Sequence, residues 1–267
     1  MSQRTFDAFR QIVYNQCGIS LGDSKVALVA SRIAKRMRAL KLSTQEAYLD
    51  YLKNDKDGDE MVQFLDTIST NVTSFFREDA HFSFMQEAMP KWYAQGQRRF
   101  RIWCAASSTG EEPVTISMVL NECLPSVSDA KVLATDISTR VLKIAQQGVY
   151  AEEKVKHIPP ALRTKYFTHV KKEDGSPAWQ VKPELHRMIT WRRLNLSKPP
   201  FPMKGPLDIV FCRNVMIYFD LQVRRKLVGD IHRLLRPQGY LIVGAAETLA
   251  GIMDGYKLVQ PSVYLKV

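Results

Sequence analysis

Cysteines, acidic residues and long apolar runs are all scarce in this chain of 267 residues. The four cysteines are widely spaced and form no C-x-x-C pair, so a zinc site is not expected, and Cys104 and Cys212 are predicted to be reduced core residues. No apolar run approaches the roughly 18–20 residues that cross a bilayer, and the first residues lack the apolar core of a signal peptide. We therefore expect a cytoplasmic protein without membrane insertion.

The shortage of acidic residues leaves the chain strongly basic. Asp and Glu number 27 against 38 Lys and Arg, which gives a formal net charge of +11. Such a balance favours an acidic partner, and both nucleic acid and an acidic protein surface satisfy it.

Glycine is also scarce where a nucleotide-binding loop would need it. Residues 103–113 read W-C-A-A-S-S-T-G-E-E-P, between a strand-like run at 100–104 and a helix-like run at 115–123. The loop is no full G-x-G-x-x-G motif, and no Lys-Ser/Thr pair follows Gly110, which excludes a phosphate-binding P-loop. Two carboxylates, Glu111 and Glu112, would repel a pyrophosphate at this helix start. The loop therefore predicts a nucleoside that carries positive charge, and S-adenosylmethionine fits that description.

The first 75 residues predict a separate helical domain, with helices at 5–17, 23–40, 44–53 and 59–69. The second helix has basic residues but no acid from Lys25 to Lys41, and its Lys25, Arg32 and Arg36 share one side. This side is either a solvated helix face or a docking surface for an acidic partner, and the sequence favours the two equally.

Residues 76–267 predict an α/β domain with a parallel sheet covered on both faces. The expected strands are 100–104, 131–135, 207–212 and 240–244, the expected helices are 114–123, 139–147 and 221–235, and an antiparallel hairpin closes the chain. The interval of about 150–192 predicts an inserted β subdomain, with a hairpin of 166–170 and 178–181 and a third strand at 185–191.

Polar residues at the predicted strand ends are candidates for the site. Asp136 ends the second strand and is placed to bind both ribose hydroxyls of a nucleoside; its alternative role, a helix N-cap, is equally open to Ser138. Asn214 and Tyr218 follow the third strand above the pocket, with Asp220 as the next N-cap. Between the two domains, Asn71, Thr73 and Arg77 are polar without an obvious structural role.

Five ordered motifs then give a resemblance. The segments S-T-N-x-T-x-F-F-R-E, S-T-G-E-E-P, A-T-D-I, L-N-L and F-C-R-N-V-x-I-Y-F occur at 69–78, 108–113, 134–137, 194–196 and 211–219. Together they resemble the chemotaxis-receptor glutamate methyltransferases, the CheR family, over essentially the whole chain. The resemblance implies a Rossmann-like, S-adenosylmethionine-dependent methyltransferase domain that carries a helical N-terminal domain and a small antiparallel β insertion.

The resemblance also implies an activity and its residues. The reaction would convert receptor glutamates to glutamyl methyl esters and release S-adenosylhomocysteine, with Arg77 and Tyr218 flanking the reactive methyl group. The acidic receptor bundle would face the basic helix, and the β insertion would assist docking, with a receptor C-terminal peptide as one candidate ligand. The implied cofactor contacts are Asn71, Thr73, Arg77, Glu111, Asp136, Asn195, Leu196, Arg213 and Asn214, and the implied receptor contacts are Lys25, Arg32, Arg36 and Arg38.

Two departures and three alternative functions accompany this interpretation. Val114 replaces the aromatic residue that usually follows G-E-E-P, and G-A-A-E at 244–247 replaces the usual G-H-S-E. A nucleic-acid methyltransferase would suit the charge, but Pro199-Pro200-Phe201 precedes the strand at 207 and is interpreted as a linker turn. A second alternative is the same chemistry on another signalling protein. A third is a cofactor-sensing adaptor without activity.

Overall fold

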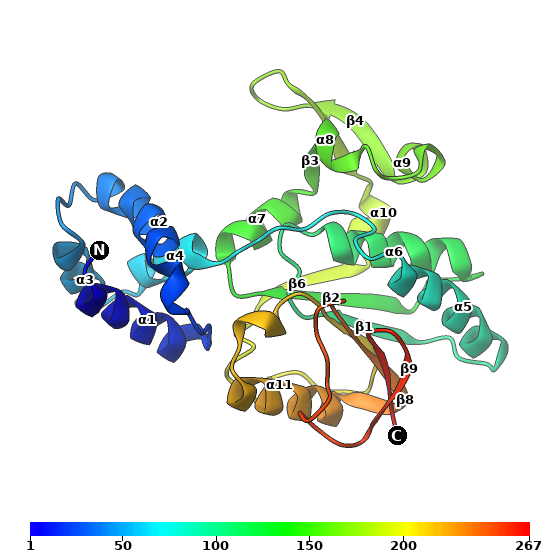
Figure 1. Ribbon diagram of the computed structural model, residues 1–267. Helices are drawn as coiled ribbons and strands as arrows, with labels where there is room; N and C mark the ends of the chain where they lie inside the picture. The colour runs from blue at the N-terminus through cyan, green and yellow to red at the C-terminus, as the bar shows by residue number, and fades with distance from the viewer.

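The N-terminal part of the computed structural model, which describes residues 1–267, is a bundle of four helices (Figure 1). Phe9 and Phe64 lie in its core with the ring of Tyr48, and Val29 and Ile33 bury the apolar stripe of the basic helix. The predicted helix at 23–40 begins as a 3-10 turn, η1 (Asp23–Lys25), because Lys25 leaves helical geometry there. The helices are α1 (Gln3–Cys17), α2 (Val26–Ala39), α3 (Gln45–Lys53) and α4 (Asp59–Ile68).

The larger part is built on a seven-stranded sheet in the order β6-β2-β1-β7-β8-β10-β9. The first five of these strands are parallel, and β10 and β9 close the sheet as the predicted antiparallel hairpin. The bounds are β1 (Phe100–Cys104), β2 (Ala130–Asp136), β6 (Ile189–Arg193), β7 (Leu207–Cys212), β8 (Leu235–Val243), β9 (Tyr256–Gln260) and β10 (Val263–Lys266).

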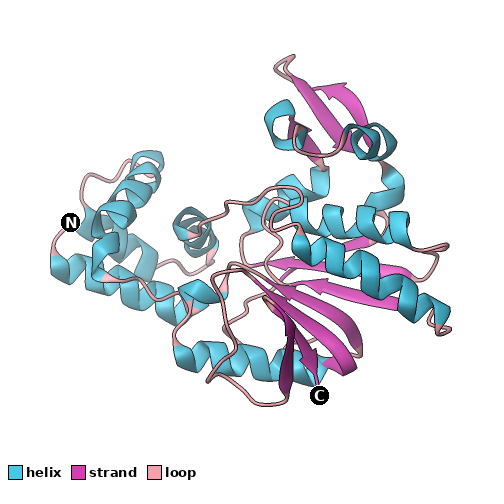
Figure 2. Ribbon diagram, turned by 45° about the vertical axis from the view of Figure 1, so that its right-hand side comes forward, coloured by secondary structure: helices cyan, strands magenta, loops and turns pink.

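Helices cover both faces of this sheet, as predicted (Figure 2). Alternate residues of β1 enter different cores: Ile102 packs with the first helical layer and Trp103 with the second, which is the period-2 pattern of a strand buried on both sides. The chain leaves central β1 for β2 on one side and later returns to β7 on the other, which places a switch point at the carboxyl ends of β1 and β7. One layer is α5 (Ala80–Ala94), α6 (Glu111–Cys123) and α7 (Thr139–Gln147), and the other is α11 (Leu221–Leu234).

A small antiparallel sheet stands away from the main one, at the top of Figure 1. It contains the predicted hairpin of β4 (Phe167–Lys171) and β5 (Pro177–Val181), but the predicted third strand at 185–191 is wrong. The third strand is β3 (Val149–Ala151), which pairs with β5, whereas β6 pairs with β2 in the main sheet. A short run with alternate residues buried fits the edge of either sheet, so its sequence cannot specify the partner. The subdomain also holds α8 (Glu152–Val155) and α9 (Pro160–Tyr166), and α10 (Pro183–His186) leads back to the main sheet.

Strand β8 begins five residues before its predicted start, immediately after α11. The strand therefore includes the turn-like residues 237–239. Its pairing with β7 shifts register between Leu207 and Ile209. Every helix falls short of the length and apolar character that a bilayer-spanning segment requires.

Candidate cofactor and substrate cleft

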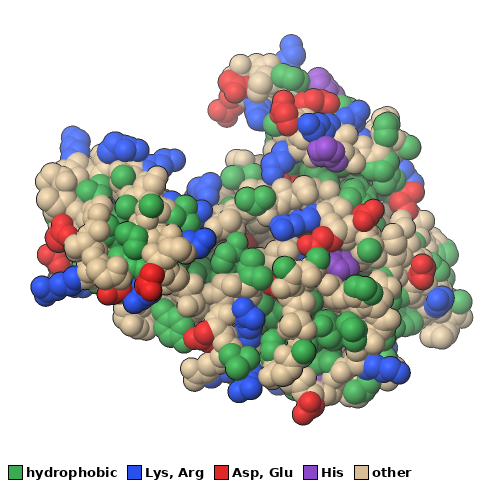
Figure 3. Space-filling view, viewed as in Figure 1, with side chains coloured by type: hydrophobic (Ala, Val, Ile, Leu, Met, Phe, Trp, Pro, Cys, Tyr) green, Lys and Arg blue, Asp and Glu red, His purple; other side chains and the backbone are tan.

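A cleft lies at the carboxyl ends of β1, β2 and β7, where the helical bundle meets the sheet. The face shown in Figure 3 is hollowed between the bundle and the small sheet, and Lys and Arg side chains gather on the bundle beside this hollow. Most of the predicted site residues line the cleft: Lys25, Arg32, Asn71, Thr73, Arg77, Asp136, Leu196, Arg213, Asn214 and Tyr218.

The loop after β1 is fixed by its own backbone and by β2. The Ser107 amide donates to the Thr135 carbonyl at 2.8 Å, and Gly110, at φ +97°, turns the chain into α6. A Cβ on Gly110 would lie 2.8 Å from the Tyr150 hydroxyl and 2.9 Å from Ala145 Cβ. Glycine is therefore required at this residue for close packing against the protein itself.

Asp136 is a buried carboxylate that two backbone amides hold at the end of β2. Its two oxygens accept from the amides of Ser108 and Ser138, each at 2.9 Å. Burial raises the pKa of Asp136 above its usual value in spite of these donors. Ser138, whose hydroxyl accepts from Val141, is the N-cap of α7, so Asp136 does not have that role. Its remaining lone pairs are free for the hydroxyls of a ribose.

The two glutamates at the start of α6 face different surroundings. Glu111 is fully buried, accepts from Thr109 Oγ1 at 2.6 Å and from Lys154 Nζ at 2.9 Å, and does not line the cleft. Glu112 lines the cleft and pairs with Arg213 at 2.5 Å. Consecutive helical residues point about 100° apart, so of these two glutamates only Glu112 faces the cleft, and the contact of Glu111 with the cofactor stays a prediction.

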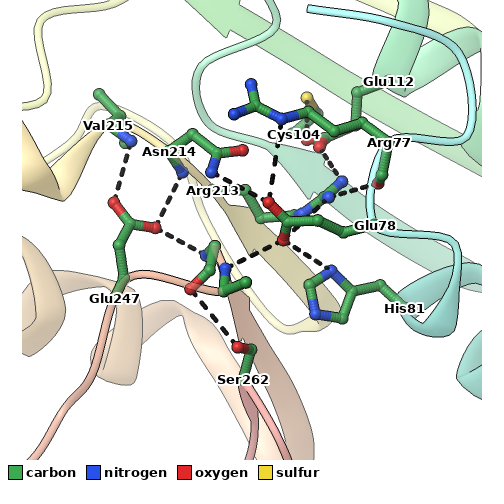
Figure 4. A network of polar contacts seen from close by, with 12 residues as sticks. Arg77, Glu78, His81, Cys104, Glu112, Arg213, Asn214, Val215, Glu247 and Ser262 are labelled. Atoms are coloured by element: carbon green, nitrogen blue, oxygen red, sulfur yellow. Dashed lines mark hydrogen bonds and ion pairs between the residues drawn. The ribbon is translucent and has the colours of Figure 1, made fainter.

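The loop after β7 carries Arg213, Asn214 and Tyr218 on the wall of the cleft. Figure 4 shows the first two with their polar partners. Arg213 is buried and also pairs with Glu78 at 3.3 Å, and Asn214 Nδ2 donates to that same carboxylate at 3.1 Å. Burial alone would raise the pKa of Glu78, but donors from Asn214, Arg213 and the Ala245 amide lower it below its usual range. Asn214 has a left-handed φ of +56°, and the 3-10 turn η2 (Met216–Tyr218) follows.

The linker from the bundle crosses the cleft and is anchored by one aromatic side chain. Phe75 is buried against Tyr150 and Phe167, with ring centroids 5.0 and 5.6 Å apart. This anchor fixes the polar residues on either side of it, and Arg77 donates to the Val72 carbonyl at 3.0 Å.

Two buried nitrogen donors on the cleft wall, Asn71 Nδ2 and Arg213 Nε, have no hydrogen-bond partner within the protein. Donors of this kind, together with the Asp136 carboxylate, suit a ligand that combines a carboxylate with a ribose, as S-adenosylmethionine does. The structure holds no group of three or more His, Cys, Asp and Glu side chains suited to a metal ion.

The helical bundle forms the opposite wall of the cleft, which the sequence did not reveal. Ile19 forms a bridge with Phe219, and the Ser20 amide donates to the Tyr218 carbonyl at 2.8 Å. Tyr14 donates to the N-cap carboxylate of Asp220 at 2.6 Å. The segment after α1 therefore contacts the loop that carries Tyr218, and the only sequence signal for it is a glycine-rich helix end.

Two other predicted contacts are placed differently by the structure. Arg36 donates to Glu60 of α4 at 3.0 and 2.6 Å, and Tyr48 shares that carboxylate, so Arg36 is held in the bundle and its contact with a receptor stays a prediction. Glu60, which neutralises the charge of Arg36, lies on α4 and therefore outside the acid-free segment from Lys25 to Lys41. Asn195 donates to the Gln16 carbonyl at 2.6 Å and does not line the cleft, although Leu196 does.

The predicted receptor contacts differ in their exposure. Lys25 and Arg38 are exposed, whereas Arg32 is half-buried and donates to the Ile68 carbonyl and to Thr70 Oγ1. Lys25 and Arg32 are the two that also line the cleft.

The doubly covered sheet, its switch-point cleft and the carboxylate at the end of β2 suit a bound nucleoside, and the family model of residues 71–265 makes the protein an S-adenosylmethionine-dependent methyltransferase. Family models match nearly the whole chain: the all-alpha domain of CheR methyltransferases matches residues 4–69, and their SAM binding domain matches residues 71–265. The chain therefore belongs to the CheR methyltransferase family.

Relatives of known name are similar over almost their full length. A chemotaxis protein methyltransferase of Borreliella burgdorferi is 35% identical over 96% of this chain and 92% of its own. Chemotaxis protein methyltransferase 2 of Pseudomonas aeruginosa is 36% identical over 98% of this chain and 93% of its own length. The Escherichia coli chemotaxis protein methyltransferase is 34% identical over 99% of this chain and 91% of its own length.

Proposed function

We propose that this methyltransferase acts in the cytoplasm and transfers methyl groups from S-adenosylmethionine to glutamate side chains of chemotaxis receptors. The products are glutamyl methyl esters and S-adenosylhomocysteine. The observation that carries the proposal is that the cleft has two chemically different walls. Asp136, Arg213 and Asn214 line it from the sheet, and Lys25 and Arg32 of the basic helix line it from the bundle. One wall suits the cofactor, and the other suits an acidic protein surface.

The substrate needs no general base. A glutamate side chain has an ordinary pKa of about 4.3, so it is already ionised near neutral pH. Bound S-adenosylmethionine would supply an electrophilic sulfonium methyl group. One carboxylate oxygen would form the new C–O bond as the C–S bond breaks, and the electron pair of that bond remains on sulfur. Cys17, the cysteine on the cleft wall, is no rival nucleophile, because burial raises its pKa to about 11.

Arg77 and Tyr218 are the proposed catalytic residues. Arg77, half-buried on the linker, would orient the incoming carboxylate by charge and hydrogen bonding. Tyr218 would place its hydroxyl oxygen beside the methyl group and help to replace the water shell of the carboxylate.

Cofactor binding is assigned to Asn71, Thr73, Asp136, Leu196, Arg213 and Asn214. Glu112 joins them, since Glu112 is the glutamate that lines the cleft, and the contact of Glu111 stays a prediction. Receptor docking is assigned first to exposed Lys25 and Arg38, with Arg32 at the cleft edge. The β insertion offers a second docking element for a receptor C-terminal peptide.

The test measures transfer of labelled methyl groups to a receptor cytoplasmic fragment and to the same fragment with its candidate glutamates replaced by alanine. We expect ester formation on the first fragment alone. Arg77→Ala and Tyr218→Phe should each lower turnover, with cofactor binding by titration calorimetry as the control for folding. Unchanged turnover in both variants would remove these two roles.

Duplex DNA and RNA serve as the competing substrates. Their methylation, or binding to them that weakens steeply with salt, would favour the nucleic-acid alternative. Ester formation on a different signalling protein but not on the receptor fragment would move the same chemistry to another substrate. Cofactor binding without transfer to any substrate would favour an adaptor.

A further inference from the structure

Glu247 makes an unusual set of contacts at the rim of the cleft, and none of the predicted roles includes it. Its carboxylate is buried and accepts from four backbone amides, and Figure 4 shows those of Asn214 and Val215 among them. Oε2 accepts from Gly244 at 2.6 Å and from Asn214 at 2.8 Å, and Oε1 accepts from Val215 at 3.0 Å and from Ile217 at 3.2 Å. The hydrogen-bond donors to this carboxylate are therefore all backbone amides.

These four amides belong to segments whose own backbone offers them no hydrogen-bond acceptor. After β7 the chain enters a left-handed residue, Asn214, and then the short turn η2, so the amides of Asn214, Val215 and Ile217 have no helix or sheet acceptor. Buried amides without acceptors are costly, and an ionised carboxylate offers about four lone-pair sites. Glu247 therefore replaces the missing backbone acceptors of the loop.

The surroundings leave little freedom for another arrangement. A Cβ on Gly244 would lie 2.5 Å from Asn214 Nδ2 and 2.9 Å from Glu247 Oε2, so glycine is required there. Glu78 holds the side-chain amide of Asn214 from the other side at 3.1 Å. Asn214 is thus fixed twice, with its backbone held by one carboxylate and its side chain by another.

The same geometry explains why G-A-A-E can stand for G-H-S-E. The side chains of Ala245 and Ala246 are exposed, and Ala245 contributes its backbone amide to Glu78 at 3.0 Å. The contacts that hold the loop come from Gly244 and Glu247, and both are present.

We propose that Glu247 is a positioning residue for methyl transfer: it fixes the loop that presents Asn214 and Tyr218 to the cleft. The proposal rests on the function given above for these two residues. Contacts to the cofactor from Asn71, Asp136 and Leu196 come from other elements, so loss of Glu247 should affect the rate of the chemical step more than cofactor affinity.

The test compares Glu247→Gln with Asp230→Asn, a matched control. Asp230 is also a buried carboxylate that accepts from a backbone amide, that of Phe201 at 2.7 Å, and it pairs with Arg233, but it holds no residue that lines the cleft. Both variants should lower the melting temperature. Glu247→Gln turns an amide donor toward two of the four N–H groups, and we expect a fall in kcat of about tenfold or more, with the cofactor Kd within about threefold. Asp230→Asn should leave kcat within about twofold.

Hydrogen exchange of the peptide 213–219 gives a second readout that does not depend on the substrate. Glu247→Gln should speed exchange in this peptide, and Asp230→Asn should not. If wild-type protein methylates no receptor fragment, the proposed function fails, while the exchange comparison still decides whether Glu247 holds the loop.

Glu247→Asp keeps the charge with a shorter side chain and should give an intermediate rate, which covers the case that the glutamine variant does not fold. A fall in kcat no larger than that of Asp230→Asn, or unchanged exchange in 213–219, would overturn the proposal.

Discussion

The loops after β1 and β7 leave neighbouring strands at the same edge of the sheet, but they are held by different means. The loop after β1 bonds to β2 through the amides of Ser107 and Ser108, and Gly110 packs directly on its neighbours. The loop after β7 bonds instead to side chains and segments from elsewhere: Glu247, Glu78 and Ser20. The first is rigid because of the sheet, whereas the second depends on three separate attachments.

Arg213 joins the two loops, and its removal should have the largest effect. Arg213→Met leaves Glu112 and Glu78 without their shared cation, and we expect the free energy of unfolding to fall by about 3 kcal/mol, measured by urea denaturation. Arg10→Met, which breaks surface pairs with Asp7 and Asp23, should cost about 1 kcal/mol or less. Equal losses would show that the two loops are not joined by this residue.

A pH effect should arise beside the loop after β7. Burial and the nearby Arg213 lower the pKa of His81 to about 4, compared with about 6.5 in the unfolded chain. The folded protein favours neutral His81. Its contribution to the free energy of unfolding is therefore complete above pH 6.5 and is lost as pH falls toward 4. Between pH 7 and pH 5 the loss should be about 2 kcal/mol.

Urea denaturation at the two pH values measures this loss in wild-type protein and in His81→Leu. The variant should lose less stability than wild type over the same interval, and the exposed His157→Gln should behave as wild type. Identical pH dependence in all three proteins would assign the effect to other groups.

A substitution beside the loop after β1 should change the affinity for the cofactor. Asp136→Asn keeps the size of the side chain but turns a donor toward one of the two amides and removes the charge. We expect the cofactor Kd to rise by about tenfold or more, measured by titration calorimetry. Asp208→Asn, a buried carboxylate on the Arg101 amide at the other end of the strands, should leave Kd unchanged. A similar Kd in both variants would contradict ribose binding by Asp136.

The smallest effect is expected at Ala245. Ala245→His places the usual family residue on an exposed position whose backbone amide already serves Glu78. Stability should change by less than about 0.5 kcal/mol and the methyl-transfer rate by less than about twofold. A larger rise in rate would mean that the histidine side chain itself takes part in the reaction.

The elements that were predicted well are those whose pattern is local. The buried run at 100–104 and the amphipathic run at 139–147 become β1 and α7 with the expected bounds, because burial on a strand or helix repeats within the segment itself. The strand at 189–193 was assigned to the wrong sheet because its partner, β2, lies far away in the sequence.

The site shows the same division. Asp136, Arg213 and Asn214 reach the cleft as expected, because the carboxyl ends of parallel strands meet at one edge. The orientation of Glu111 and Glu112 depends on where the helix begins, and Arg36 and Asn195 are turned away by Glu60 and Gln16, which no local pattern identifies. Glu247 was missed for the same reason. The division into residues 1–75 and 76–267 stays a prediction.

The contact between Ser20 and the Tyr218 carbonyl has a consequence for modularity. The boundary between the two family models falls near residue 70, but in space the segment after α1 is part of the wall that carries Tyr218. A bundle exchanged between relatives would have to bring a matching segment at 17–21, or the acceptor loop would change with it. Under the roles proposed above, receptor docking and catalytic geometry would therefore change together, although their residues lie in the parts matched by two different family models.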